Sequence, residues 1–191
     1  MENNFEQALN TPWKLVNEFF MFLYKPFVCL YLILTGVNVG KGNKFYGFPK
    51  VMRCRGSKMI IGNHFECRNG HFSNPLGINH PLILCTWKKD ARIKIGNDVG
   101  ISGGSIVASD NIEIGDGAII GANCTIIDTD FHPIKSMARR YDKENIRSKM
   151  VKIGKNVFIG MNCLILKGAN IPDNAVIPAG SVVRADQKTF T

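Results

Sequence analysis

The sequence predicts a mainly β protein, a solenoid of parallel strands built from six-residue repeats. Two observations lead to this prediction. Isoleucine or valine recurs every six residues near the C-terminus, at positions 153, 159, 165, 171, 177 and 183, and a small or β-branched residue stands four positions after each isoleucine. A period of six is neither helical nor alternating, and it fits a short strand followed by a tight turn, with the aliphatic side chain pointing inward.

The same six-residue rhythm appears earlier in the chain. Clear copies are IGNDVG, ISGGSI, IGDGAI and IGANCT between residues 95 and 125, and looser copies begin at residues 39 and 61. Glycine, asparagine and aspartate occupy the expected bends, where a positive φ is accessible to them. One coil buries little apolar surface, so each coil must stack on its neighbours. A sandwich of short strands is the alternative, and the regularity of the repeats argues against it.

These units resemble the repeats of the hexapeptide-repeat acyltransferases, [I/V/L]-G-x-x-[small]-x, from about Val37 to the C-terminus. The resemblance implies a left-handed parallel β-helix, triangular in section, with three hexads in each turn. It divides the chain into an apolar helical segment at 1–36 and a β-helix acyltransferase domain at 37–191. It also implies that the protein is an acyltransferase that uses acetyl-CoA as co-substrate.

The repeats break off after Ile126 and resume at Val151. The chain there reads DTDFHP, followed by a stretch rich in lysine, arginine and aspartate. Pro133 marks the exit from the sheet because it cannot donate to a strand ladder. Long irregular segments inside compact folds are usually functional, so we expect a protruding, functional loop at about 128–150.

His132 stands at the base of this loop. Acyl transfer to an alcohol requires a base near neutral pH, where imidazole changes its protonation. DTDFHP resembles most closely the galactoside, maltose and nodulation O-acetyltransferases and those of polysaccharide gene clusters. In these relatives the histidine before the proline is the general base, and the resemblance gives that role to His132. The alternative is a structural histidine that caps the loop.

Two aspartates, Asp128 and Asp130, flank His132 and are candidate substrate-binding residues. One of them could orient the imidazole or hold an acceptor sugar, and the other could only cap the turn, as aspartate often does. The galactoside enzymes also carry an acceptor-binding asparagine in an earlier coil, where this chain has Ser102 or Gly103. Ser102 is our candidate there, and the departure means that the acceptor need not be a galactoside.

The resemblance also indicates a site for acetyl-CoA. The corresponding positions are Phe158, Gly160, Met161, Ala179, Gly180 and Arg184. Phe158 replaces the aromatic residue that the relatives carry in a V-W-I-G pattern. Ala179 and Gly180 match positions where the backbone of the relatives approaches the pantetheine arm. Arg184 falls where the relatives place polar or basic residues near the CoA phosphates. The alternative role of Phe158 is packing on the surface of the next coil, and that of Ala179 and Gly180 is to form a turn. The relatives usually continue past the final ADQKTFT with a segment that covers the cofactor. Three alternatives follow from this departure: a more open CoA site, a lower affinity for CoA, or a protein that has drifted from activity.

A single β-helix offers flat faces and no deep pocket. The relatives form trimers with the active site between two subunits, so the resemblance implies a homotrimer in which the loop reaches its neighbour. The expected acceptor is a hydroxyl of a sugar or glycan precursor. The alternatives are N-acetylation of an amino-sugar nucleotide and a non-catalytic β-helix scaffold.

Residues 13–36 are very apolar, and Lys25 and Pro26 divide them into two pieces. Each piece is shorter than the roughly twenty residues that a spanning helix needs, so we expect two short helices. Three alternatives stay open. The helices cap the open end of the solenoid, they contact the membrane surface peripherally through aromatic anchors such as Trp13 and Phe20, or they span the membrane.

The composition narrows the remaining function classes. The net charge is +9, but the basic residues are dispersed and no nucleic-acid-binding motif accompanies them, so we expect no nucleic-acid partner. Six scattered cysteines and the lack of a secretory signal favour the cytoplasm, with the inner face of the membrane as an alternative. His64, Cys67 and His71 lack a complete zinc spacing, so we expect no metal and no carbonic anhydrase of the γ type.

Overall fold

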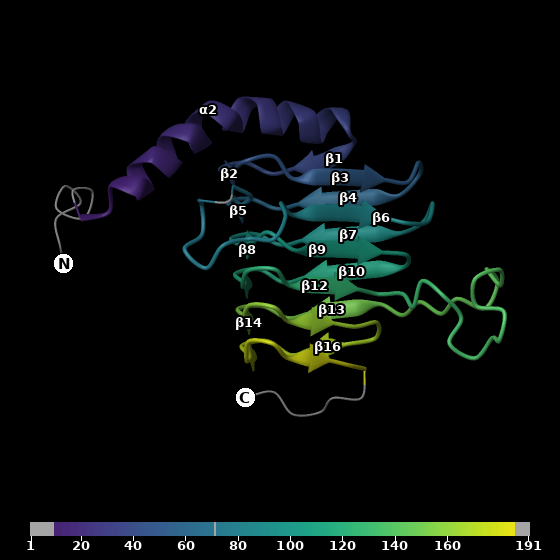
Figure 1. Ribbon diagram of the computed structural model, residues 1–191. Helices are drawn as coiled ribbons and strands as arrows, with labels where there is room; N and C mark the ends of the chain where they lie inside the picture. The colour runs from purple at the N-terminus through teal and green to yellow at the C-terminus, as the bar shows by residue number, and fades with distance from the viewer. Residues whose placement is uncertain (1–9, 71, 186–191) are drawn as a thin grey trace.

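The computed structural model describes residues 10–70 and 72–185, and the remaining residues of the predicted 1–36 and 37–191 segments lie outside this part of the chain. The described residues from Val37 onward form three parallel sheets of six strands each (Figure 1). Each turn of the chain adds one strand to every sheet, and successive turns stack along one axis. The predicted left-handed parallel β-helix of hexapeptide repeats is therefore confirmed.

We name the sheets A, B and C in the order in which the chain visits them. Sheet A contains β1 (Val37–Val39), β4 (Lys58–Ile61), β7 (Arg92–Ile95), β10 (Asn111–Ile114), β13 (Val151–Ile153) and β16 (Asn170–Ile171). Sheet B contains β2 (Lys44–Tyr46), β5 (Glu66–Arg68), β8 (Gly100–Ser102), β11 (Ile119–Ile120), β14 (Phe158–Ile159) and β17 (Val176–Ile177). Sheet C contains β3 (Lys50–Arg53), β6 (Ile83–Thr86), β9 (Ser105–Ala108), β12 (Thr125–Ile127), β15 (Leu164–Ile165) and β18 (Val182–Val183).

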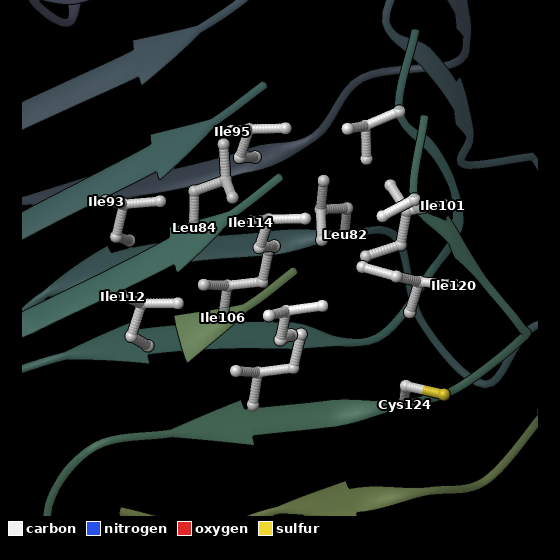
Figure 2. Packing of buried hydrophobic residues seen from close by; sticks show 14 of the residues in the cluster. Leu82, Leu84, Ile93, Ile95, Ile101, Ile106, Ile112, Ile114, Ile120 and Cys124 are labelled. Carbon is white, nitrogen blue, oxygen red and sulfur yellow. The ribbon is translucent and has the colours of Figure 1, made fainter. Parts of the chain in front are cut away.

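The hexad isoleucines form columns inside the solenoid. In sheet A, Ile114 pairs with Ile95 on one side and with Ile153 on the other, and all three side chains are buried. Figure 2 shows isoleucines from several strands pointing into the same interior. The six-residue period of the sequence thus becomes a vertical stack, in which every coil buries its aliphatic side chains against the coils above and below.

The N-terminal segment forms one helix, α2 (Pro12–Leu34), and the prediction of two short helices is wrong. Pro26 lies inside the helix, where it removes one backbone hydrogen bond, and Figure 1 shows that the helix bends along its length. Packing holds the helix together across this defect, because Val28 and Leu32 are fully buried against the first coil. The helix lies across the open end of the solenoid, which it caps.

Two insertions lengthen corners of the β-helix without breaking its stacking. Residues 128–150 leave the corner between sheets C and A and stand out from the side of the stack (Figure 1). Residues 69–82 extend the corner between sheets B and C two coils earlier than the break in the hexads. The first insertion was expected, and the second was not recognised because its flanking strands match the repeat only loosely.

Candidate active site

The loop at 128–150 leaves and re-enters the solenoid at a single closed base. Thr129 and Ser148 form an antiparallel bridge across this base. The amide of Lys149 donates to the carbonyl of Asp128 at 2.8 Å, and the amide of Asp130 donates to the carbonyl of Arg147 at 3.1 Å. These bonds fix the position from which the loop projects, and with it the position of His132.

Asp128 is fully buried at this base and faces the protein backbone. Its two carboxylate oxygens accept hydrogen bonds from the amides of Ser109 at 2.7 Å and Asp110 at 2.8 Å. Burial raises the pKa of this carboxyl, and the two amide bonds partly oppose that rise. The geometry gives Asp128 the turn-capping role that the sequence left open, because neither oxygen faces solvent, and it does not place this residue against an acceptor.

The imidazole of His132 is exposed at the loop base and held by the loop itself. Its Nδ1 lies 3.4 Å from the carbonyl oxygen of Arg139, and its backbone amide donates to the carbonyl of Asp130 at 2.7 Å. A carbonyl only accepts, so this contact is a hydrogen bond when Nδ1 carries the proton. In that tautomer Nε2 is unprotonated and available to take a proton from a ligand.

The carboxylate of Asp130 pairs with Lys167 rather than standing free. Its Oδ2 lies 3.1 Å from the Nζ of Lys167, and both side chains are largely shielded from solvent. This pair borders a cavity of about 400 Å³, whose wall also includes Phe131, Leu166 and Arg184. Two of the predicted site residues, Asp130 and Arg184, therefore line the same cavity. Phe131, the residue before His132, lines it too.

A second cavity, of about 610 Å³, is lined mainly by residues of the loop, between Pro133 and Arg147, together with Lys167 of the solenoid. Its wall includes polar side chains of the loop, among them Asp142, Asn145 and Arg147. Ile134 and Lys167 belong to the walls of both cavities, so the two spaces adjoin. Together they offer apolar surface on one side and hydrogen-bonding groups on the other.

Most of the predicted cofactor residues gather at the opposite edge of sheet C. Gly160, Met161, Ala179 and Gly180 stack at the corner between sheets B and C, where the amide of Gly180 donates to the carbonyl of Met161 at 2.8 Å. Phe158 lies nearby on β14 with its ring half exposed. Within one protomer, the width of sheet C separates this corner from His132.

Ser102 also lies at the corner between sheets B and C, at the end of β8. Its hydroxyl accepts a hydrogen bond from Asn74 at 2.9 Å, and Asn74 belongs to the insertion at 69–82. The structure thus brings Ser102 together with the predicted cofactor residues and not with His132.

Sequence reasoning missed two residues of the site. Lys167 was hidden inside the regular hexad ILKGAN, so its spacing gave no signal of a role. Trp87 packs edge to face on Phe131 with ring centroids 5.9 Å apart, but the two residues stand 44 positions apart in the sequence (131 − 87) and meet only once the coils are stacked. The only hint in the sequence that Trp87 belongs to the site was the residue type itself.

Among residues 10–70 and 72–185, no group of three histidine, cysteine, aspartate or glutamate side chains is arranged to hold a metal ion. His71, which took part in the zinc interpretation, lies outside the described residues. The six cysteines are free, and burial raises the pKa of the Cys124 thiol to about 12.

Comparison with known proteins agrees with the repeat. Residues 150–185 match the family model described as the hexapeptide repeat of succinyl-transferase. A galactoside O-acetyltransferase of Escherichia coli (strain K12) is 38% identical over 82 residues, which are 43% of this chain and 39% of that relative. The match thus spans about two fifths of the length of the relative. Both findings confirm the resemblance to the hexapeptide-repeat acyltransferases.

Proposed function

We propose that this hexapeptide-repeat protein is an acetyltransferase that moves an acetyl group from acetyl-CoA to a hydroxyl of a sugar or glycan precursor. The observation that carries the proposal is the exposed imidazole of His132, held through Nδ1 by the carbonyl of Arg139, between two residues that line adjoining cavities, Phe131 and Pro133. The O-acetyltransferase name of the matching relative supports the same chemistry.

In the proposed reaction, Nε2 of His132 takes the proton of the acceptor hydroxyl while the hydroxyl oxygen attacks the thioester carbonyl. The bond between the carbonyl carbon and the CoA sulfur then breaks, and the imidazolium returns the proton to the leaving thiolate. The product is an acetyl ester, and no oxidant or reductant is needed. Asp130 and Lys167 act as positioning residues at the loop base rather than as the base itself.

We further propose a homotrimer in which two neighbouring protomers build each site. Except for Arg184, the residues expected to bind acetyl-CoA lie at the edge of sheet C opposite to His132, so one protomer does not bring them together with His132. A cyclic arrangement of parallel solenoids places one edge of each protomer against the other edge of its neighbour. In this arrangement the 128–150 loop carries His132 towards Phe158, Gly160, Met161, Ala179 and Gly180 of the next protomer.

The acceptor belongs on the loop side of the site in this proposal. The larger cavity offers carboxylate, amide and guanidinium groups, from Asp142, Asn145 and Arg147, which suit the several hydroxyls of a sugar. Arg184 borders the smaller cavity together with the paired Lys167, and it is assigned to the CoA phosphates. We place the reaction in the cytoplasm, in keeping with six free cysteines.

The test measures release of free CoA from acetyl-CoA in the presence of a hydroxylated glycan, for the wild type and for His132→Ala. We expect the substitution to lower kcat about 10²- to 10⁴-fold, because it removes the general base. His64→Ala is the matched control, since His64 is also exposed but lies in an early coil, 3.4 Å from Asp98. Equal rates for wild type and His132→Ala would remove the proposed base.

The acceptor class is decided by a second arm of the same assay. We expect release of CoA with the hydroxylated glycan and not with an amino-sugar nucleotide as sole acceptor. The reverse result would favour the N-acetyltransferase alternative. Failure of the wild type to bind or turn over acetyl-CoA with either acceptor would favour a scaffold.

A further inference from the structure

We propose that α2 docks this protein onto the surface of an anionic lipid bilayer, lying flat on it rather than crossing it. The helix meets the length and apolarity of a membrane-spanning segment, yet most of it is exposed to solvent. An exposed apolar helix on the end of a solenoid needs a partner surface.

The two sides of α2 differ in what they contact. One side packs on the first coil through Val28 and Leu32. The other side presents only apolar residues at helical spacing, and we call this set the apolar face: Leu15, Phe19, Phe22, Leu23, Leu30 and Ile33. The charged residues of the helix, Lys14, Glu18 and Lys25, lie off this face. A helix of a soluble protein shows the opposite pattern, with its polar side outward.

A collar of positive charge surrounds the first coil directly beneath the helix. Residues 37–58 contain no aspartate or glutamate and six exposed cations, which we call the basic collar: Lys41, Lys44, Lys50, Arg53, Arg55 and Lys58. An apolar helix above a ring of cations is complementary to a bilayer that carries negative headgroups. The same collar opposes pairing of two copies through their apolar faces, since like charges would meet around the rim.

Contacts along α2 favour a helix that lies on the bilayer over one that spans it. Asn17 donates to the carbonyl of Phe72 at 3.1 Å near one end, and the hydroxyl of Tyr31 accepts from the amide of Val51 at 3.1 Å near the other. The hydroxyl of Tyr46 donates to Glu18 between them. Crossing the bilayer would break these contacts and bury Glu18 and Lys25 in hydrocarbon.

The orientation of the molecule follows from the same contacts. Figure 1 shows α2 lying across the end of the stack, so the solenoid axis would stand away from the bilayer. The 128–150 loop then projects sideways, several coils from the lipid. The protein would reach acceptors carried at the membrane surface while its loop stays in water.

Flotation of the full chain with vesicles tests this inference. We expect binding to vesicles of phosphatidylcholine mixed with phosphatidylglycerol and much weaker binding to phosphatidylcholine alone. The double variant Phe19→Ser/Phe22→Ser should lose more than about tenfold in affinity, because two exposed aromatic side chains leave the lipid. Met137→Ser is its control, since Met137 is 95% exposed on the distant loop, compared with 74% for Phe22.

A second pair of variants tests the charge. Each lysine near the anionic surface should contribute about fivefold to the affinity, so Lys50→Gln/Lys58→Gln should weaken binding to the anionic vesicles by more than about tenfold. Lys152→Gln/Lys155→Gln removes two exposed lysines from later coils and should leave binding unchanged. Circular dichroism of each variant verifies that the fold is retained.

Three results would overturn the inference. They are absence of wild-type binding to either vesicle, equal loss in the variants and their controls, and resistance of the bound protein to alkaline carbonate, which marks a spanning helix. Self-association that disappears in Phe19→Ser/Phe22→Ser, without any vesicle binding, would show a second copy on this face instead. None of these results depends on whether the protein transfers acetyl groups.

Discussion

Asp128 shows how one buried carboxylate fixes the origin of the loop. Both of its oxygens accept backbone amides, from Ser109 and Asp110, so an asparagine could satisfy only one of them and would point its own N–H₂ at the other. We expect Asp128→Asn to lower the free energy of unfolding by about 1–3 kcal/mol, measured by chemical denaturation. Asp142→Asn, on the exposed part of the loop, is the control, and equal effects of the two would contradict the capping role.

The raised pKa of Asp128 also predicts the sign of a pH effect. The folded state holds the proton of this carboxyl more tightly than the unfolded chain, whose ordinary value is 3.8. The stabilising contribution is therefore full below that value and is lost as the pH rises through the folded-state pKa. Unfolding curves from acid to neutral pH should show the stability advantage of the wild type over Asp128→Asn shrinking as the pH rises, while it stays positive at neutral pH. A difference that grows with pH would show that the amide bonds outweigh burial.

Lys167 was invisible in the sequence and is central in the structure. Its pairing with Asp130 at 3.1 Å joins the loop base to the next coil, beside the cavity that Arg184 also borders. We expect Lys167→Met to lower kcat/KM for acetyl transfer about tenfold by loosening the loop base, with Lys167→Arg retaining most of the activity. Equal losses in both variants would mean that the ammonium group touches substrate rather than positioning the loop.

At the scale of the coil, glycine marks the places where neighbouring turns approach most closely. A Cβ at Gly121 would lie 2.5 Å from the backbone nitrogen of Met161 in the next coil, whereas nothing lies within 4 Å of a Cβ at Gly100. We expect Gly121→Ala to lower stability by about 1–3 kcal/mol and Gly100→Ala to have little effect. Thermal unfolding of both variants measures the difference. Similar melting temperatures would show that the coils separate readily.

The strands could be predicted from the sequence because each hexad is a local signal. Ile153 and Ile159 occupy equivalent places in successive hexads, and the structure buries both in the same way. The helix could not be predicted as one piece, because Pro26 is a local signal for a break while the packing of Val28 and Leu32 depends on the assembled end of the solenoid. An element could therefore be predicted where residues close in the sequence decide its structure. The prediction failed where packing against residues distant in the sequence decides it.

The candidate active site could likewise be predicted only in part from the sequence. His132 could be predicted because DTDFHP interrupts a regular repeat, so its position is recorded in the sequence itself. The partner of its ring could not, since the carbonyl of Arg139 reaches it only after the loop has folded back. The roles of Asp128 and Asp130 likewise required knowledge of which carboxylate turns inward.

At the scale of the whole molecule, the two ends of the solenoid have different surroundings. The first coil is covered by α2 and encircled by the basic collar, whereas the loop with His132 projects from a later coil. The proposed membrane contact and the proposed active site therefore do not compete for surface. A trimer of parallel solenoids would place three α2 helices on the same side, so that several weak contacts with lipid would act together.

The proposed trimer makes a prediction that a monomer cannot satisfy. His132→Ala lacks the base, and Ala179→Glu places a bulky negative charge at the exposed corner assigned to acetyl-CoA, so each variant alone should be inactive. If every site takes His132 from one protomer and the acetyl-CoA corner from its neighbour, trimers reassembled from an equal mixture should contain intact sites. About a quarter of the sites would combine two unmodified edges, so we expect about a quarter of the wild-type rate. Sedimentation velocity verifies that each variant is still a trimer. A mixture of intact trimers that stays inactive would place both edges of the site on a single protomer, and the loop would then have to reach across its own sheet C.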